Sequence, residues 1–406
     1  MNREQIKQKL QLKTVDISHL IQFNELLRYV FQVTDADIEE GGYEDEQEIA
    51  RAKRPVLATS DVIGWFDGDD LISQIAVYPC EVNIHGTPFN MGGVTGVGTY
   101  PEYSNLGLMK ELIEVALTNM RERNQWISYL YPYNIPYYRR KGWEIISDKM
   151  TFSIKDSQLP AVVPVPGYIE RLDHDHPDVK KAYDAFAKQT HGAMIRSELN
   201  WDEYWRWENE EERIAAVYYD SEDNPTGFCF YWLAEDTFHI KEMIYLNQEA
   251  RTGLWNFITA HFSMIDQVVG NTYKNEPIAF TLDDSDITET IQPFFMARIV
   301  DVEQFLAHYP FENEAEPFHF EIFDPIAKWN NGIFSVSWTE EGGIQVTNEP
   351  IGTKVSLDIQ TLTTMLMSYK RPRYLYHLGR IQTEAIVIKQ LEKIIPNQTA
   401  YFSDYF

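Results

Sequence analysis

Cysteine is scarce in this chain of 406 residues, and its scarcity excludes several classes of protein. Only Cys80 and Cys229 occur, far apart and in apolar surroundings. Two such residues do not build the disulfide framework of a small secreted domain or a cysteine-based metal site. A reducing compartment is the simpler interpretation.

Long apolar runs and basic residues are also scarce. No run of about 18 apolar residues occurs, and the N-terminal MNREQIKQKLQLK has no apolar stretch behind its charges. The sequence therefore predicts a cytoplasmic protein without membrane insertion. Lys and Arg number 35 against 62 Asp and Glu, and the net charge of −27 would repel nucleic acid and attract cationic small molecules. An acidic surface that merely keeps the protein dispersed explains the same charge.

The length predicts two to three domains. Residues Ser157–Pro166 hold three prolines and form the first predicted linker, and the sequence changes character beyond Asp283–Asp286. A strand at Phe238–Tyr245 and a helix at Thr252–Val269 faintly repeat an order found in the first domain. Alternating residues such as HFEIFD and IFSVSW then indicate half-buried strands. We predict domains at 1–156, 157–286 and 287–406.

Residues 91–144 carry the pattern most informative about function. Glycines alternate with small and β-branched residues in Val94–Tyr100, so a ligand can approach this predicted strand closely. Ser104–Gly107 then open an amphipathic helix, whose unpaired N–H groups and dipole favour an anion. An apolar strand at Trp126–Leu130 and a tyrosine-rich turn follow. This order is suited to holding a pyrophosphate.

On these residues the chain resembles the Gcn5-related N-acetyltransferase (GNAT) family, whose Arg/Gln-x-x-Gly-x-Gly/Ala loop grips the pyrophosphate of acetyl-CoA. The segment Ser104–Met109 lacks the leading Arg or Gln and the second small residue. The resemblance implies that acetyl-CoA lies along a bulged strand, against this loop, and at the opening between two strands. The residues that match these three places are Val97, Gly98 and Thr99; Asn105, Leu106, Gly107, Leu108, Met109 and Lys110; and Tyr133 and Asn134.

The resemblance is strongest to the Eis (enhanced intracellular survival) branch, and there it covers essentially the whole chain. It is carried by GVTGVGTYPEYSNLGLM, PYYRRKGW, the faint second unit and FFMARIVDVEQFL. It implies an α/β (α+β) fold with two tandem acetyltransferase-like mixed-sheet domains and a sterol-carrier-protein-like domain. It also implies a homohexamer that acetylates amines. The acceptors would be cationic small molecules, aminoglycoside-like or polyamine-like, or lysine side chains.

The same resemblance implies two catalytic groups. Tyr138 matches the general acid by its spacing to Gly142, with Tyr137 as the alternative assignment. The terminal carboxylate of Phe406 matches the general base, although an α-carboxyl group needs desolvation to become basic enough. A buried tyrosine and an aromatic terminus that only pack on the core are the competing interpretations.

Other patterns carry less chemistry. The Asp173–His176 loop lacks further clustered ligands, so no metal is predicted. The acidic run Glu39–Glu48 either recruits a cationic substrate or is a solvated loop, and the aromatic residues of Trp201–Trp207 either line a cleft or pack on the core. A weakly catalytic protein that binds CoA or lipid through its last domain is the alternative function.

Overall fold

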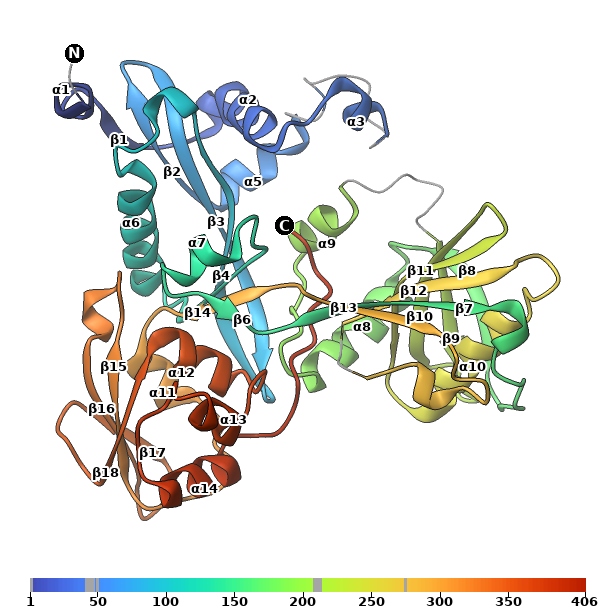
Figure 1. Cartoon of the computed structure of the whole chain (residues 1–406). Coiled ribbons are helices and arrows are strands. Elements are labelled where there is room, and N and C mark those ends of the chain that lie inside the picture. The colour runs from blue at the N-terminus through green and yellow to red at the C-terminus, as the bar shows by residue number, and fades with distance from the viewer. Residues whose placement is uncertain (1–2, 41–47, 49–50, 207–213, 274–275) are drawn as a thin grey trace.

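The strands of the chain form three sheets. The computed structural model describes residues 3–40, 48, 51–206, 214–273 and 276–406. Within these residues, two mixed sheets have seven strands each and a third sheet has four (Figure 1). The predicted α/β (α+β) fold, with two acetyltransferase-like sheets and a smaller third unit, is confirmed.

The first sheet has the order β1, β2, β3, β4, β5, β14, β6. In that order its strands span Gln11–Thr14, Asp61–Asp67, Asp70–Ile84, Thr87–Thr99, Ile127–Leu130, Met296–Ile299 and Glu144–Ile145. The strands β2 and β3 form the hairpin that the Asp67-Gly68 turn between VIGWF and LISQIAVY predicts. Residues Cys80–Ile84, which by themselves predict a separate strand, are the continuation of β3, because β4 pairs with β3 from Ile84 back to Ser73.

Helices cover both faces of this sheet (Figure 1). One face carries α6, Leu108–Glu122, which buries the predicted apolar stripe of Leu112, Ile113, Ala116, Leu117 and Met120. The other carries α2, Leu20–Phe31, and α5, Arg54–Thr59. Short helices complete the unit at Arg3–Lys7 (α1), Ile17–His19 (η1), Asp35–Glu40 (α3), Pro101–Tyr103 (η2) and Ile135–Arg139 (α7). The helix α3 replaces part of the loop expected after residue 35, and residues 41–47 of the acidic run lie outside the described residues.

The second sheet has the order β13, β7, β12, β11, β10, β9, β8. In that order its strands span Thr288–Pro293, Asp148–Lys155, Gln267–Thr272, Thr237–Tyr245, Pro225–Ala234, Ile214–Tyr219 and Tyr168–Asp173. Its helices are α8 (Pro177–Gln189), α9 (Glu198–Trp205) and α10 (Gln248–Thr259), with short turns η3 (Asp156–Gln158) and η5 (Ala279–Thr281). The helix expected at Thr252–Val269 was wrong in its bounds, because residues 267–272 pair as β12 with β11 and β7.

The third sheet has the order β17, β16, β15, β18. These strands span Ile344–Thr347, Gly332–Trp338, Phe318–Phe323 and Thr353–Asp358. The accompanying helices are α11 (Val302–His308), η6 (Lys328–Asn330), α12 (Ile359–Leu366), α13 (Pro372–His377) and α14 (Ala385–Ile394). None of the described helices combines the length and the apolar character needed to cross a bilayer.

The sheets exchange strands across the predicted domain boundaries. Although β7 precedes residue 156, it pairs with β12 and β13 in the second sheet. Although β14 follows residue 286, it lies between β5 and β6 of the first sheet. The sheets therefore do not end at the boundaries predicted from the sequence, and the chain crosses between the first two units more than once.

The last residues, 396–406, lack helix and strand and form what we call the C-terminal strap. It leaves the third unit and runs between the first and second units toward β4 (Figure 1). Its residues Tyr401, Phe402, Ser403 and Asp404 are buried. The strap therefore brings the end of the described chain into the interior.

Candidate active site

The candidate site lies where two parallel strands of the first sheet separate. The strand β4 pairs with β5 only over Met91–Gly93. Beyond Gly93, β4 continues to Thr99 paired with β3 alone, while β5 ends at Leu130. The divergence leaves one edge of β4 open for an extended ligand that carries amide groups.

The open part of β4 is bulged. Its register against β3 shifts between Gln74 and Ala76, opposite Gly96 and Val97. Gly96 adopts a left-handed conformation with φ of 59°. A cavity of about 480 Å³ runs along this strand and is lined by Val94–Thr99. The strand predicted to contact a pantetheine arm is therefore bulged and open to a cavity.

The predicted anion loop ends at Gly107, which forms the N-cap of α6 with φ of 78°. Among the described residues no side chain caps this helix, so its first N–H groups have no intrahelical or side-chain partner there. The side chains of Leu106 and Leu108 pack on Leu10 and its neighbours, so only their backbone can serve a ligand. The loop therefore offers backbone donors, with the exposed polar side chains of Ser104 and Asn105 beside them.

A cation from a distant segment approaches this loop. Lys7, at the end of α1, forms an ion pair with Glu111 in the first turn of α6. A Cβ placed on Gly107 would lie 3.8 Å from the Lys7 ammonium nitrogen. Sequence reasoning missed Lys7 because about a hundred residues separate it from the loop. Its ammonium group neutralises Glu111 at the place where the loop lacks an Arg or Gln of its own.

The tyrosine predicted as the general acid lies on α7 beside the same cavity. Tyr138 is 7% exposed, and its ring contacts those of Tyr137 and Trp143. Burial raises the pKa of Tyr138 well above its ordinary value, with a smaller contribution from Tyr137. The hydroxyl therefore keeps its proton at neutral pH and is able to donate it.

The third unit holds α7 in place. Arg298 of β14 is fully buried, forms an ion pair with Asp324 and donates to the Lys141 carbonyl just after α7. Gln360 of α12 donates to the Arg139 carbonyl at 2.8 Å. The position of Tyr138 thus depends on residues of the third unit.

Phe406 lies at the point where β4 and β5 separate. Phe406 is 9% exposed, and its ring centroid lies 5.5 Å from that of Phe295 and 6.1 Å from that of Tyr78. A Cβ on Gly93 would come within 2.9 Å of the Phe406 ring, so only glycine admits this ring beside β4. Phe406 and Tyr138 line the same cavity although they are far apart in sequence.

The strap is anchored on the second unit by a buried ionic cluster. Arg196 donates to Asp404 at 2.7 Å and to Glu242 of β11 at 3.2 Å, and all three side chains are at most 3% exposed. Burial raises the pKa of Asp404 although Arg196 opposes this effect. Burial also acts on Glu242, but Arg196 together with its hydroxyl partners brings the pKa of Glu242 below its ordinary value.

Aromatic rings surround the same arginine. The Arg196 guanidinium carbon lies 3.8 Å from the ring centroid of Tyr183, 4.4 Å from Trp201 and 4.1 Å from Tyr204. The Trp201–Trp205 part of the predicted aromatic cluster therefore packs in the interior, where Trp201 and Tyr204 hold Arg196. Trp207 lies outside the described residues.

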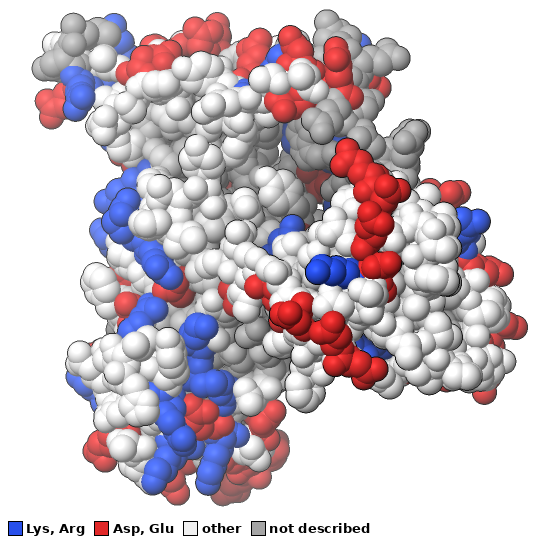
Figure 2. Space-filling view, turned by 45° about the vertical axis from the view of Figure 1, so that its right-hand side comes forward, with Lys and Arg blue, Asp and Glu red and all other residues white. Residues whose placement is uncertain are grey.

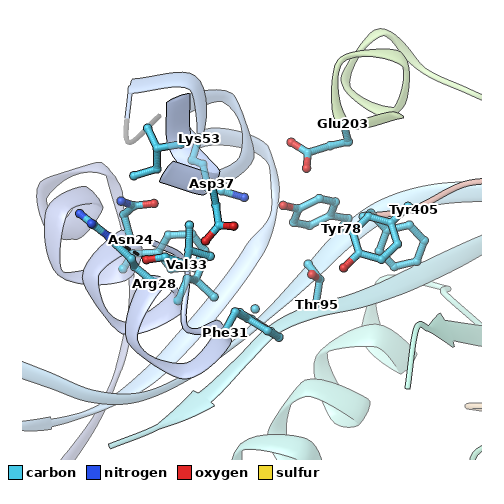
Figure 3. Close-up of a pocket in the computed structure, with 15 residues that line it drawn as sticks. Asn24, Arg28, Phe31, Val33, Asp37, Lys53, Tyr78, Thr95, Glu203 and Tyr405 are labelled. Carbon is cyan, nitrogen blue, oxygen red and sulfur yellow. Dashed lines mark hydrogen bonds between the residues drawn. The ribbon is translucent and has the colours of Figure 1, made fainter. Parts of the chain in front are cut away.

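A second cavity, of about 590 Å³, adjoins the first. The two share five lining residues, namely Phe31, Thr95, Gly96, Tyr405 and Phe406. Asp37 and Lys53 lie on one side of the second cavity, and Tyr78, Tyr405 and Glu203 lie on the other (Figure 3). Glu203 comes from α9 of the second unit, so residues of both units line this cavity. The described charges are balanced, because Arg28 and Lys53 oppose Asp37 and Glu203.

Two family models with the description "Acetyltransferase (GNAT) domain" match residues 11–146 and 192–299. A third model, "Sterol carrier protein domain", matches residues 302–403. The chain belongs to the GNAT acetyltransferases. It is a tandem GNAT enzyme with a sterol-carrier-like last domain, and GNAT domains use acetyl-CoA. None of the curated proteins matches the chain.

Solved structures share the three-domain fold of this GNAT protein. A probable N-acyltransferase from Enterococcus faecalis is 26% identical, with a TM-score of 0.86 over 98% of this chain and 99% of that chain. A GCN5-related N-acetyltransferase from Anabaena variabilis is 23% identical, with a TM-score of 0.84 over 98% and 100%. Eis1 from Mycobacterium abscessus is 17% identical, with a TM-score of 0.79 over 98% and 100%.

The structure brings together most of the residues singled out from the sequence. Those that line the first cavity are Val97, Gly98, Thr99, Met109, Tyr133, Asn134, Tyr138, its alternative Tyr137, and Phe406. Asn105, Leu106, Gly107, Leu108 and Lys110 form the adjoining loop and helix start and do not line this cavity. Lys110 is engaged with Glu114 at 3.6 Å. Sequence reasoning did not select Val30, Phe31, Tyr131, Arg140 and Tyr405 as site residues, although Arg140 lies in the PYYRRKGW segment.

Proposed function

We propose that this GNAT enzyme acetylates a primary amine at the junction of the two cavities in the first domain. One observation carries the proposal: the bulged edge of β4, Tyr138 and the last residue, Phe406, meet at one cavity. The uncapped start of α6 and the open strand edge fit the phosphates and the pantetheine arm of acetyl-CoA. Val97, Gly98, Thr99, Tyr133 and Asn134 would hold that arm.

Acetyl-CoA would supply an acetyl thioester in the first cavity. The α-carboxylate of Phe406 would accept a proton from the amine, whose nitrogen forms a bond to the acetyl carbon. Tyr138 would donate its proton to the sulfur as the carbon–sulfur bond breaks. Backbone N–H groups of the bulge near Val97–Thr99 would stabilise the negative charge on the acetyl oxygen. No group of this mechanism requires a metal.

The second cavity would hold the acceptor. Phe406 lines it as well as the first cavity, and Glu203 and Asp37 provide carboxylates for a cationic amine (Figure 3). Asp and Glu side chains also gather over the second domain on the face shown in Figure 2, where they would attract cations. Aminoglycoside-like compounds, polyamines and lysine side chains remain the predicted acceptors.

The predicted homohexamer is tested by light scattering on the purified chain.

The role of the terminal carboxylate is tested by moving it. Removing Phe406, or adding two glycines after it, should lower kcat for acetyl transfer by at least about tenfold, because proton acceptance contributes about 10²-fold to 10⁴-fold in such reactions. Phe406→Leu is the matched control, since it replaces the ring by a smaller apolar side chain but leaves the carboxylate in place. Thiol release is measured over an amine panel at saturating acetyl-CoA. Unchanged turnover in the extended chain would exclude the carboxylate as base.

A further inference from the structure

The second GNAT domain contains a cavity at the same topological place as the first domain's site. Its volume is about 570 Å³, within the range of about 300–1,000 Å³ typical of small-molecule sites. It lies where β11 and β12, a parallel pair, separate after Ile240 and Gly270. From Glu242 to Tyr245, β11 is paired only with β10 among the described strands.

Most walls of the two cavities correspond. In the first domain, α2, β4, α6, the residue after β5 and the strap line the cavity, and in the second domain α8, β11, α10, β12 and the strap do so. In addition, α7 lines the first cavity, and Phe152 of β7 and Thr281 of η5 line the second. Phe31 of α2 has its counterpart in Phe186 of α8. The strap contributes Phe406 to the first cavity and Tyr401 to the second. One segment therefore contacts both cavities.

The two cavities differ at the start of the helix that lies beside them. The first helix, α6, has no side-chain cap, whereas the side chain of Asn247 accepts from the Ala250 N–H at the start of α10. Glu249 also places a carboxylate in the first turn of α10. A diphosphate would meet an occupied donor and a negative charge there.

The remaining walls suit an uncharged chain with amide groups. Gln189, Gln248 and Asn271 provide side-chain amides, and the edge of β11 provides backbone donors and acceptors. Rings and apolar groups complete the lining, including Phe152, Phe186, Tyr245, Trp255 and Tyr273. Arg251 and Glu276 are the charged residues among the described lining.

We propose that this second cavity binds a pantetheine-type chain, extended along the free edge of β11, without the nucleotide diphosphate of coenzyme A. The proposal goes beyond acetyl transfer in the first domain, because it assigns a separate ligand site to the second domain. The chain could be free pantetheine thioester or the prosthetic arm of a carrier protein, since both present the same amide groups.

The test measures how many molecules bind per chain. Radiolabelled S-acetylpantetheine is titrated in equilibrium dialysis against the full-length protein and four variants. Met243→Trp and Gln248→Trp fill the second cavity, the latter from an exposed position at its mouth. Met109→Trp fills the first cavity. Met264→Trp places the same indole at a residue that is 60% exposed and serves as the control.

The wild type and Met264→Trp should bind two molecules per chain at saturation, and each filling variant should bind one. A folded Gln248→Trp protein that still binds two would overturn the proposal, as would a wild type whose single bound molecule is lost in Met109→Trp. Loss in the second-cavity variants alone would support the proposal even if the first domain proved inactive. A competition experiment with an acylated carrier protein separates the two sources. If the site takes the prosthetic arm of a carrier protein, the acylated carrier protein displaces S-acetylpantetheine from the second cavity. If the site takes only the free thioester, it does not.

Discussion

The first and second GNAT domains share an opening between parallel strands, but they differ at its two ends. In the first domain, the opening begins at an uncapped helix start with Lys7 beside it and ends at Tyr138 and Phe406. In the second domain, Asn247 caps the helix start, and the strap contributes Tyr401 to the cavity before it continues to Phe406. Under our two proposals, the shared opening binds an extended chain, and the differences at its ends restrict acetyl transfer to the first domain.

The comparison also assigns a task to the second domain. Through Arg196 and Glu242 it holds the strap by which Phe406 reaches the first domain. Tyr401 adds a hydrogen bond of 2.5 Å to the same Glu242. The second domain thus holds the segment that brings Phe406 to the first cavity.

The largest effect is expected at Tyr138, because the proposed mechanism places the reaction in the first domain. Tyr138→Phe should lower kcat by about 10²-fold to 10⁴-fold while the KM for acetyl-CoA changes little. Tyr374→Phe, at an exposed residue, is the control and should leave kcat unchanged. Steady-state thiol release checks both variants. A Tyr138→Phe enzyme with normal turnover would remove Tyr138 from the mechanism.

The next effect tests the anchoring of the strap. Arg196→Met leaves Asp404 and Glu242 buried without their cation, which should destabilise the fold by about 3–5 kcal/mol and lower kcat. Urea denaturation and thiol release measure the two consequences. Arg373→Met, at an exposed position, should affect neither. If stability falls but kcat does not, the strap is structural and the second domain has no part in the first domain's site.

A smaller effect separates the two helix starts. Lys7→Gln removes the cation beside Gly107, so the KM for acetyl-CoA should rise about twofold to fivefold, as expected for a partly exposed charge. The KM for S-acetylpantetheine should not change, because it lacks the phosphates. Lys9→Gln provides an exposed control in the same segment. An equal rise for both thioesters would show that Lys7 acts on the fold rather than on the phosphates.

The smallest effect concerns the boundary between the domains. Burial lowers the pKa of Lys53 to about 8, with Glu203 opposing this effect and Arg206 adding to it. In the unfolded chain, Lys53 keeps its proton up to its ordinary pKa of about 10.4. Charged Lys53 therefore lowers the free energy of unfolding below about pH 8, and this free energy rises again between about pH 8 and 10.4, where only the folded protein has lost the proton. Lys53→Met should therefore raise the unfolding midpoint at pH 7 and reduce this recovery. Thermal melts between pH 7 and 10 test this, and an equal rise at every pH would contradict it.

Local features were predictable because they depend on near neighbours along the chain. The hairpin of β2 and β3, the apolar stripe of α6 and the glycine that opens this helix all follow from short patterns. The end of α10 could not be predicted, because the apolar residues continue into β12 without a local signal that ends the helix. The pairing of β14 with β5 and β6 was also missed, because the sequence of a short apolar strand does not indicate which strands it pairs with.

The sequence by itself determined the periodicity of the elements, the glycines of β4 and its loop, and the spacing from Tyr138 to Gly142. The resemblance to the GNAT family added Phe406 as a candidate. Only the tertiary structure decided that Phe406 lies against Gly93, that Lys7 reaches the loop, and that one strap contacts two equivalent cavities. These contacts join residues far apart in the chain, and they form only when three sheets pack and close the loops between them.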